Sequence, residues 1–168
     1  MTKVTQYSFA EKIVWMNENY QLHREDGPAV IEICGDKKWY RDGKIHRIGG
    51  PAIEKANGDK YWVQNDKLHR TNGPAIIEAD GTVGWYRNGW CHRDDGPAIE
   101  CPLRLKKWHQ YGLPITEKGP FKMWFKNGVR HRTDGPAIEG PNGKKVWYLH
   151  GKKMSERKWK RAVEKERK

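Results

Sequence analysis

The chain has 168 residues, of which 36% are hydrophobic and 11% aromatic, and its formal net charge is +12 at pH 7. Nine tryptophans and seven tyrosines argue against a disordered chain, because disordered chains are poor in aromatic residues. The apolar content lies in a few large rings rather than in many aliphatic side chains. This composition disfavours a compact α/β enzyme and predicts a thin structure with little deep core.

Half of the excess positive charge lies at the C-terminal end. Residues 152–168 hold nine Lys or Arg and three Glu, a net of +6, and the other 151 residues hold 24 Lys or Arg and 18 Asp or Glu, also +6. Excess positive charge favours anionic partners such as nucleic acid, acidic proteins or anionic membranes. For the first 151 residues, solubility alone is an equally good explanation.

The sequence carries no sign of secretion or of membrane insertion. The N-terminus lacks the apolar core of a signal peptide, and no stretch approaches the length of a transmembrane helix. The three cysteines, Cys34, Cys91 and Cys101, are odd in number and lack paired spacing. We therefore expect free thiols in a reducing cytoplasm.

A unit of 23 residues recurs about six times, with the signature W-Y-x-N-G-x-x-H-R-x-D-G-P-A-I-E. The Trp position recurs at steps of 24, 23, 23, 23, 16 and 23 residues, and this register predicts a tandem repeat of one supersecondary unit. The Trp positions are Trp15, Trp39, Trp62, Trp85, Trp108, Trp124 and Trp147. The His-Arg pairs begin at His23, His46, His69, His92 and His131.

Each unit carries two turn signals between short β-prone segments. Asn-Gly and Asp-Gly are the strongest local signals for a β-hairpin, because a type I′ turn needs positive φ at both central residues. The unit is therefore strand, tight turn, strand, tight turn, and its repetition predicts an antiparallel meander. The first turn lies at Asp42-Gly43, Asn65-Asp66, Asn88-Gly89 and Asn127-Gly128. The second turn lies at Asn57-Gly58, Asp80-Gly81 and Asn142-Gly143.

Strand alternation assigns faces to the segment that follows each Gly-Pro pair. The residue after Ala is always branched and apolar, and we expect it to be buried: Val30, Ile53, Ile76, Ile99 and Ile138. The next position is Ile or Glu, and we expect it to be partly exposed: Ile31, Glu54, Ile77, Glu100 and Glu139. The recurring Trp is expected to be buried, and each Gly-Pro pair is expected to bend the sheet.

The 23-residue period, the W-x-x-G-x-x-H core and the Asp-Gly or Asn-Gly hairpins resemble MORN repeats. The resemblance is closer to a variant form with H-R-x-D-G-P-A units, similar to uncharacterised proteins of bacteriophages and large DNA viruses. It covers residues 13–151 and implies an elongated, twisted single-layer β-meander with an interaction or scaffolding role. Ordinary MORN units carry His-Gly where this chain has His-Arg, and this departure weighs against a role as a membrane scaffold.

Two regions depart from the repeat. Residues 101–123 keep Trp108 and Gly119-Pro120, but they have Ile115-Thr116 in place of His-Arg and lack seven residues of the unit. In the tail, Ser155 is a candidate N-cap, and Trp159, Ala162 and Val163 share one helical face. We therefore predict a β-repeat array over residues 1–151 and a basic C-terminal helix over 152–168 that caps the array.

The histidines and cysteines are candidates for catalysis or metal binding. His23 with Asp26, and His92 with Asp95, have the i, i+3 spacing of a general-base pair. A site repeated in every unit is not one catalytic assembly, so we expect these groups to hold the bend before Gly-Pro by local hydrogen bonds. The cysteines have no four-ligand spacing with histidine. We therefore expect no catalytic residue, no metal and no cofactor.

The candidate binding residues are basic or aromatic. The repeated arginines should form a row that could grip phosphates or carboxylates, or could pair with acids such as Glu25, Asp94 or Glu54 in a neighbouring unit. Trp90 is out of register and could anchor a partner, whereas the Trp and Tyr columns could stack on bases but more often form core. The predicted partner-binding residues are Arg24, Arg47, Arg70, Arg93, Arg132, Trp90, Arg104, Lys106, Lys107, Lys158, Lys160 and Arg161.

We hypothesise a monomeric or dimeric binding module, without catalytic activity, that engages an anionic macromolecule: nucleic acid or an acidic protein surface. The family resemblance suggests a sharper alternative, a phage or viral factor that inhibits a host nucleic-acid enzyme or immune effector, or sequesters a nucleotide signal. An enzyme is the third hypothesis, and it would use the irregular residues 101–123, with His109 and Tyr111 as candidates.

Overall fold

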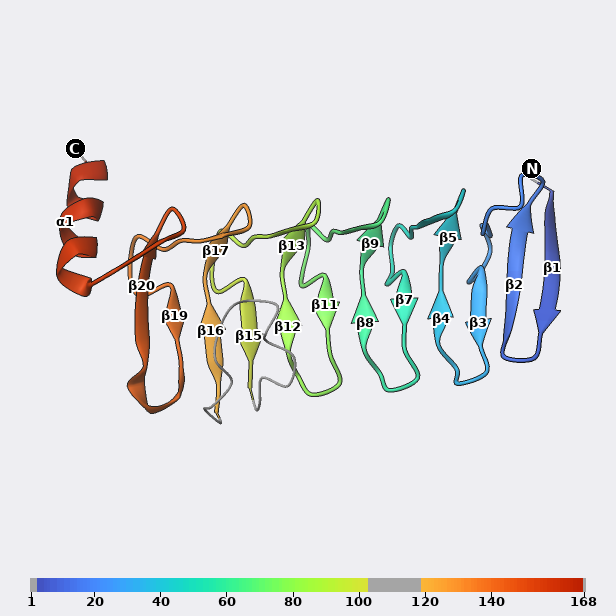
Figure 1. The fold of residues 1–168 in the computed structure, drawn as a ribbon, viewed down its shortest axis with the longest axis horizontal. Coiled ribbons are helices and arrows are strands. Elements are labelled where there is room, and N and C mark those ends of the chain that lie inside the picture. Colours follow the sequence, from blue (N-terminus) through green and yellow to red (C-terminus); the bar gives the residue numbers. More distant parts are fainter. Residues whose placement is uncertain (1–2, 103–118, 168) are drawn as a thin grey trace. The chain divides into compact units, whose positions relative to one another are not determined.

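The structure is a computed structural model that describes residues 3–102 and 119–167. The chain divides into two compact units, Met1–Ala79 and Asp80–Lys168, which we call unit 1 and unit 2. Both consist of short antiparallel strands that pair in chain order, and the only helix longer than one turn among the described residues lies at the C-terminal end (Figure 1). The predicted all-β meander with a short C-terminal helix is therefore confirmed.

The main sheet of unit 1 has seven strands. It starts with a regular hairpin of two six-residue strands, and every later connection in the sheet follows the repeat. The strands, in order of pairing, are β1 (Val4–Phe9), β2 (Lys12–Asn17), β3 (Val30–Glu32), β4 (Lys37–Lys38), β7 (Ile53–Glu54), β8 (Lys60–Tyr61) and β11 (Ile76–Ile77).

The main sheet of unit 2 has six strands. They are β12 (Val83–Gly84), β15 (Ile99–Cys101), β16 (Phe121–Met123), β19 (Ile138–Glu139), β20 (Lys145–Leu149) and β21 (Lys152–Met154). A single 3-10 turn, η2 (Pro141–Gly143), connects β19 to β20.

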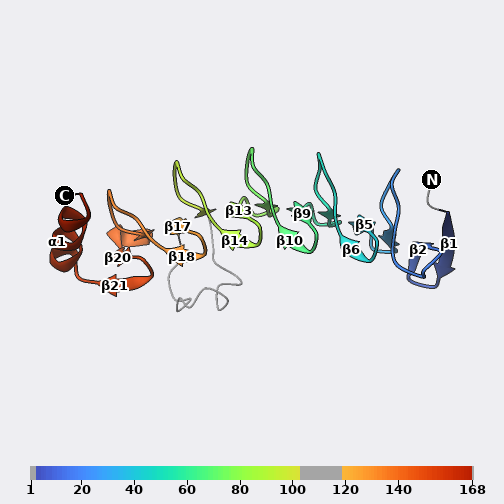
Figure 2. The same cartoon turned by 90° about the horizontal axis from the view of Figure 1, so that it is seen from above.

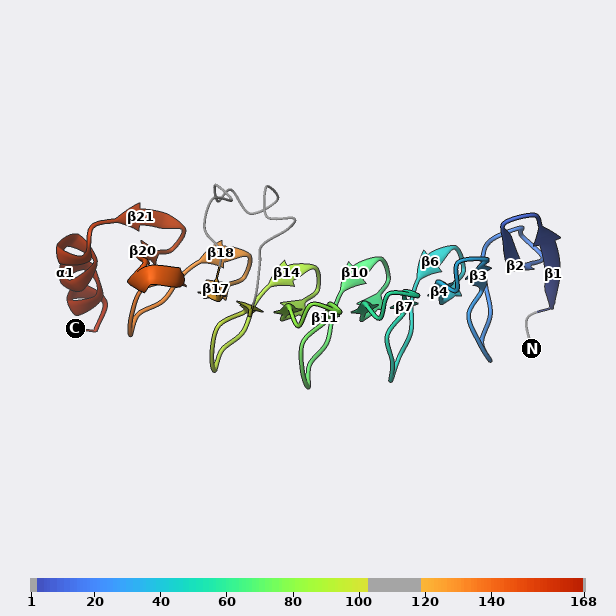
Figure 3. The same ribbon diagram turned by 90° about the horizontal axis from the view of Figure 1, so that it is seen from below.

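Each repeat also forms a small two-stranded hairpin, which we call the side hairpin. In unit 1 the side hairpins are β5 (Tyr40–Arg41) with β6 (Lys44–Ile45), and β9 (Val63–Gln64) with β10 (Lys67–Leu68). In unit 2 they are β13 (Tyr86–Arg87) with β14 (Trp90–Cys91), and β17 (Phe125–Lys126) with β18 (Val129–Arg130). Within each unit the side hairpins lie on one side of the sheet, and the long loops that follow them project on the other (Figures 2 and 3).

The first predicted turn has the expected type I′ geometry. Its two central residues both have positive φ, as in Asp42 (49°) with Gly43 (76°) and Asn127 (49°) with Gly128 (80°). The second turn varies: at Asn57-Gly58 only Gly58 has positive φ (94°), whereas at Asn142-Gly143 both residues do (58° and 74°). The loop at Asn57-Gly58 is closed by two backbone hydrogen bonds. There the amide of Lys55 donates to Asp59 and that of Gly58 donates to Lys55, so the loop is one residue wider than a type I′ hairpin.

The core is made of smaller side chains than predicted. The alanine of every Gly-Pro-Ala segment is fully buried: Ala29, Ala52, Ala75, Ala98 and Ala137 all have 0% exposure. Of the branched residues that follow, Val30, Ile99 and Ile138 are buried as expected, but Ile53 and Ile76 are half-buried. The next column is half-buried throughout, as predicted for a partly exposed face.

The six recurring tryptophans within the described residues are half-buried, less buried than predicted, and Trp108 lies outside those residues. Five of them donate their backbone N–H to the carbonyl of a buried alanine, as from Trp39 to Ala52 at 2.9 Å and from Trp124 to Ala137 at 2.9 Å. A methyl group beside an indole ring leaves room for both in a single-layer sheet. The outer face of the ring carries an arginine instead of a second apolar layer.

The predicted C-terminal helix is present as α1 (Glu156–Glu166), with Ser155 at the N-cap position. Trp159 and Val163 are buried and form a cluster with Leu149, against which Trp147, Met154 and Ala162 pack. The indole Nε1 of Trp159 also donates to the carbonyl of Arg132 at 2.9 Å. Lys152–Met154 form strand β21 rather than helix, so the last strand lies inside the segment predicted as a cap. Within the described part of the chain, no helix is both long and apolar enough to cross a membrane.

Candidate functional site

The five arginines of the repeated His-Arg pair share one environment. The guanidinium carbon of each lies 3.7–4.1 Å from the centroid of the Trp ring of its own repeat. Nη1 of each also donates to the carbonyl of the proline four residues later, at 3.0–3.4 Å. The pairs are Arg24 with Trp15, Arg47 with Trp39, Arg70 with Trp62, Arg93 with Trp85 and Arg132 with Trp124.

The glycine of Gly-Pro covers the other face of each guanidinium. A Cβ added at Gly50 would lie 2.9 Å from the guanidinium carbon of Arg47, and one at Gly135 would lie 2.9 Å from that of Arg132. Real Cβ atoms do not approach so closely, and Gly27 is equally crowded at 2.9 Å. The fit is tight but less close at Gly96 and Gly73, where the distances are 3.1 and 3.2 Å. The Trp, Arg and Gly of the signature therefore form one stacked unit, which we call the arginine sandwich.

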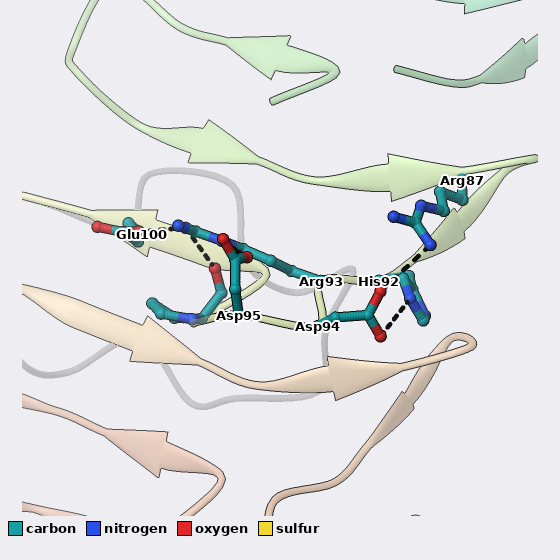
Figure 4. Close-up of polar contacts among 7 residues, drawn as sticks. Arg87, His92, Arg93, Asp94, Asp95 and Glu100 are labelled. Atoms are coloured by element: carbon teal, nitrogen blue, oxygen red, sulfur yellow. Dashed lines mark hydrogen bonds and ion pairs between the residues drawn. The ribbon is translucent and has the colours of Figure 1, made fainter. Parts of the chain in front are cut away.

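Acidic residues of the same repeat complete the sandwich where the sequence supplies them (Figure 4). Nε of Arg93 donates to Asp95 at 2.9 Å and Nη1 to Glu100 at 2.8 Å, and Arg132 bonds Asp134 and Glu139 in the same way. Where the repeat has Gly49 or Ile31 at the corresponding position, that contact is missing. The acids belong to the same repeat as their arginine, whereas the sequence suggested acids of a neighbouring unit.

These contacts shift the protonation of the acids. The hydrogen bond from Arg24 lowers the pKa of the Asp26 carboxyl, and those from Arg93 and Arg132 do the same for the pKa of Asp95 and Asp134. The arginine side chains are themselves only 17–33% exposed where ion pairs are formed. A ligand that gripped the predicted row would have to compete with these partners, so the row remains a prediction whose simpler explanation is structural.

The histidines bind the side hairpin of the next repeat. Nδ1 of His23 lies 2.7 Å from Oδ1 of Asp42, and Nδ1 of His46 lies 3.0 Å from Oδ1 of Asn65. In unit 2, Nδ1 of His92 accepts the backbone N–H of Asn127 at 3.2 Å. The i, i+3 pairing of His23 with Asp26 is therefore not formed. These histidines link two hairpins, and His92 also bonds within its own bend.

The side chain of His92 makes two hydrogen bonds at once, one through each ring nitrogen. Because its Nδ1 accepts from Asn127, Nε2 carries the proton and donates to Asp94 at 3.1 Å. Arg87 approaches Asp94 from the other side at 3.2 Å (Figure 4). The hydrogen bond from His92 is the main reason that the pKa of Asp94 is lowered.

Shallow grooves lie between consecutive loops within each unit. The groove in unit 1 has a volume of about 530 Å³ and the equivalent groove in unit 2 about 150 Å³. Arg41 and Lys126 take equivalent positions in the two grooves, and both side chains are exposed. Each groove also has acidic walls, formed by Glu25 and Asp26 or by Asp94 and Asp134. The grooves are therefore of mixed charge and do not form a strongly basic channel.

Trp90 is exposed, as its position out of register suggested. Its residue exposure is 64%, and Val129, at the same position of the next side hairpin, is 46% exposed. One edge of the Trp90 ring lies over Gly128, where an added Cβ would be 2.4 Å from the ring. The ring thus contacts Gly128 and is otherwise largely exposed to solvent. Its role as a partner anchor remains a prediction.

The predicted basic residues of the tail are exposed on α1. Lys160 pairs with Glu156 at 2.7 Å, and no acidic partner is found within the described residues for Lys158 or Arg161. The tail therefore carries basic side chains with fewer hydrogen-bond and ion-pair partners than the repeat arginines have. Arg104, Lys106 and Lys107, together with the enzyme candidates His109 and Tyr111, lie outside the described residues.

The cysteines are free thiols in this structure. Cys34 is exposed, whereas Cys91 and Cys101 are buried. Burial raises the pKa of the Cys91 thiol to about 12, which keeps it protonated and unreactive at neutral pH. Within residues 3–102 and 119–167, no three His, Cys, Asp or Glu side chains are grouped so that they could hold a metal ion.

The signal for the arginine sandwich is present in the sequence, since Trp, Arg and Gly recur together in five repeats. The spacing alone does not reveal that the guanidinium stacks between the other two.

A scan of the chain against protein-family models finds no match, and a search of curated proteins finds none either.

Proposed function

We propose that this protein is a binding module without catalytic activity, and that it engages nucleic acid through the exposed basic face of α1. The observation that carries the proposal is the different use of the two sets of basic residues. The repeat arginines are stacked and paired within their own loops, whereas Lys158 and Arg161 are exposed and have no acidic partner in the described chain. Binding to an anionic partner through charge needs basic side chains that are exposed and not already paired, as Lys158 and Arg161 are.

The chemistry of α1 favours nucleic acid over an acidic protein. Its apolar side chains Trp159 and Val163 are buried against β20, so the exposed face consists of charged groups. Protein interfaces are usually anchored by aromatic or apolar groups. A phosphate backbone needs only positively charged groups at suitable distances, and its release of counterions supplies the driving force.

The test measures fluorescence anisotropy of labelled duplex and single-stranded oligonucleotides at several salt concentrations. The double variant Lys158→Ala, Arg161→Ala removes two unpaired charges from α1. We expect the affinity for duplex DNA at about 0.1 M salt to fall about tenfold, and the slope of log K against log salt to decrease by about 2.

The matched control is Lys37→Ala, Lys60→Ala, which removes the same charge from the main sheet. Both lysines lie opposite Glu54 in the strand register, so their charge is partly balanced. The control should keep the parent affinity and slope. An equal loss in both variants, or no binding by the parent protein, would contradict the proposal. A labelled poly-glutamate probe that binds as well as DNA would point to an acidic protein instead.

A further inference from the structure

The outer edge of β1 is open. β1 pairs along all six residues with β2, and no described segment pairs with its other side (Figure 1). Natural sheets protect such edges with charges, proline, bulges or a covering helix. β1 has none of these, since Val4–Phe9 contains no charged residue and no proline. β21, at the end of the unit 2 sheet, is short and carries two exposed lysines.

The hydrogen-bond pattern shows which groups of β1 face outward. The amide of Trp15 donates to Ala29 on the side of β3, so the alternate residue Val14 faces β1 and its partner there is Tyr7. Tyr7 is therefore bonded inward. By alternation, the N–H and C=O groups of Val4, Gln6 and Ser8 point away from β2.

The side chains of β1 form an incomplete apolar row. Tyr7 lies directly opposite Val14, which is only 3% exposed and belongs to the core. Phe9 is on the same face as Tyr7, because the two are separated by one residue. With nothing beyond the edge, Tyr7 is 37% and Phe9 55% exposed.

We propose that β1 pairs with β1 of a second copy of this chain, antiparallel and symmetric about Tyr7. Symmetric pairing must place outward-facing residues opposite one another, so the axis passes through a residue and not between two. With the axis at Tyr7, Gln6 bonds to Ser8 of the other copy and the two Tyr7 rings become neighbours on one face. Thr5 then lies opposite Phe9, an aromatic–β-branched pair that stabilises sheets.

Charge also favours the axis at Tyr7. In this register Lys3 of one copy lies beside the Ala10-Glu11 turn of the other, which brings its charge near that of Glu11, and this arrangement occurs twice by symmetry. An axis at Gln6 would place Lys3 opposite Phe9 instead and would leave Glu11 beyond the paired region. The register at Tyr7 thus matches opposite charges at both ends and apolar rings at the centre, as an isologous interface requires.

The first test measures molar mass by light scattering over a series of protein concentrations up to about 500 µM, because a one-strand interface is smaller than the roughly 1,200 Å² of stable complexes. We expect the parent protein to approach twice the mass of one chain. Tyr7→Lys places like charges at the axis, and Gln6→Pro removes an outward donor without touching the β1–β2 ladder. Both should be monomers at every concentration.

The matched control is Tyr20→Lys, which changes another exposed tyrosine, of 77% exposure, away from β1. It should dimerise like the parent. Salt separates this interaction from nucleic-acid binding, because screening of the +12 charge on each copy should strengthen the dimer while it weakens binding to DNA. A monomeric parent protein, or a dimer that persists in both β1 variants, overturns the proposal.

The second test checks the register with a Tyr7→Cys variant in a Cys34→Ser background. Opposed residues of a non-hydrogen-bonded antiparallel pair have Cα atoms about 4.5 Å apart, which suits a disulfide. We expect Tyr7→Cys to cross-link under mild oxidation and Gln6→Cys, in the same background, to remain uncross-linked. Cross-linking of Gln6→Cys but not Tyr7→Cys would reject the axis at Tyr7.

Discussion

At the scale of residues, the Trp, Arg and Gly of the repeat signature form one stacked group, the arginine sandwich. Each guanidinium contacts an indole on one face and a glycine on the other, and donates to a proline carbonyl. Arginine suits this position better than lysine because its planar group stacks and keeps several donors in fixed directions. The long loop needs such a device, since a single-layer sheet gives it no second layer to pack against.

The sandwich predicts that Gly50 is required because of Arg47. Gly50→Ala places a methyl group about 2.9 Å from the guanidinium, which has to move away from Trp39 and from the carbonyl of Pro51. We expect the free energy of unfolding, measured by urea denaturation, to fall by about 2 kcal/mol, from one charged hydrogen bond and the stacking contact.

The control is a double-mutant cycle. In an Arg47→Ala background the crowding atom is absent, so Gly50→Ala should cost well under 1 kcal/mol beyond the first substitution. If Gly50→Ala costs the same in both backgrounds, the glycine is needed for another reason, such as its backbone conformation. In that case the sandwich would not explain the recurrence of Gly-Pro.

At the scale of elements, the features predicted from the sequence are those with local causes. Asp42-Gly43 and Asn127-Gly128 form the predicted turns because their positive φ values depend on the two residues themselves. Helix α1 (Glu156–Glu166) lies within the helix that is predicted over residues 152–168 because Trp159, Ala162 and Val163 share a face. The link from His46 to Asn65 joins residues 19 apart, and such contacts depend on how one repeat is placed against the next.

The side hairpins show more clearly which features the sequence does not predict. The sequence predicts one continuous strand before each Asn-Gly or Asp-Gly turn, but the chain breaks at Trp39, between β4 and β5. The first part joins the main sheet and the second pairs only with its own hairpin partner. Alternation of apolar residues does not indicate such a break.

Helix α1 depends on its docking. An isolated helix of 11 residues is marginal in water, because nucleation is costly and few hydrogen bonds follow it. Trp159→Ala removes the ring whose centroid lies 4.5 Å from that of Trp147. It also removes the hydrogen bond from the indole to the carbonyl of Arg132. We expect a loss of about 3–5 kcal/mol in the stability of the docked helix, and a loss of its circular dichroism signal at 222 nm.

The control for this prediction is Lys158→Ala, which changes the exposed neighbour of Trp159 and favours helix slightly. Its helical signal should match that of the parent. Retention of the full helical signal by Trp159→Ala would show that α1 is stable without this contact.

At the scale of the whole molecule, burial and pairing of ionisable groups set the pH range of stability. Burial and the nearby charge of His150 lower the pKa of His131, so the unfolded state binds the proton more readily. Stability from this group is complete above the ordinary histidine pKa of 6.5 and is lost as the pH falls below it. The lowered pKa values of Asp26, Asp95 and Asp134 act only below about 4.

Cys91 controls the first loss of stability on the alkaline side. Its folded pKa is raised from 9.0 to about 12 by burial, so above pH 9 the unfolded chain releases a proton that the folded protein keeps. Stability is therefore complete below pH 8 and should fall by about 1.4 kcal/mol between pH 8 and pH 10. The raised pKa values of Lys38 and Tyr61 act at higher pH, because their ordinary values are 10.5 and 10.0.

Urea denaturation at pH 8 and pH 10 under reducing conditions isolates this effect. Cys91→Ala lowers stability at both pH values by leaving a small cavity, but the difference between the two pH values should shrink by about 1.4 kcal/mol. Cys34→Ala removes an exposed thiol and should leave that difference unchanged. An equal pH dependence in the parent and in Cys91→Ala would mean that the thiol reaches water in the folded protein. The side hairpin β13–β14 that buries it would then open without unfolding of the sheet.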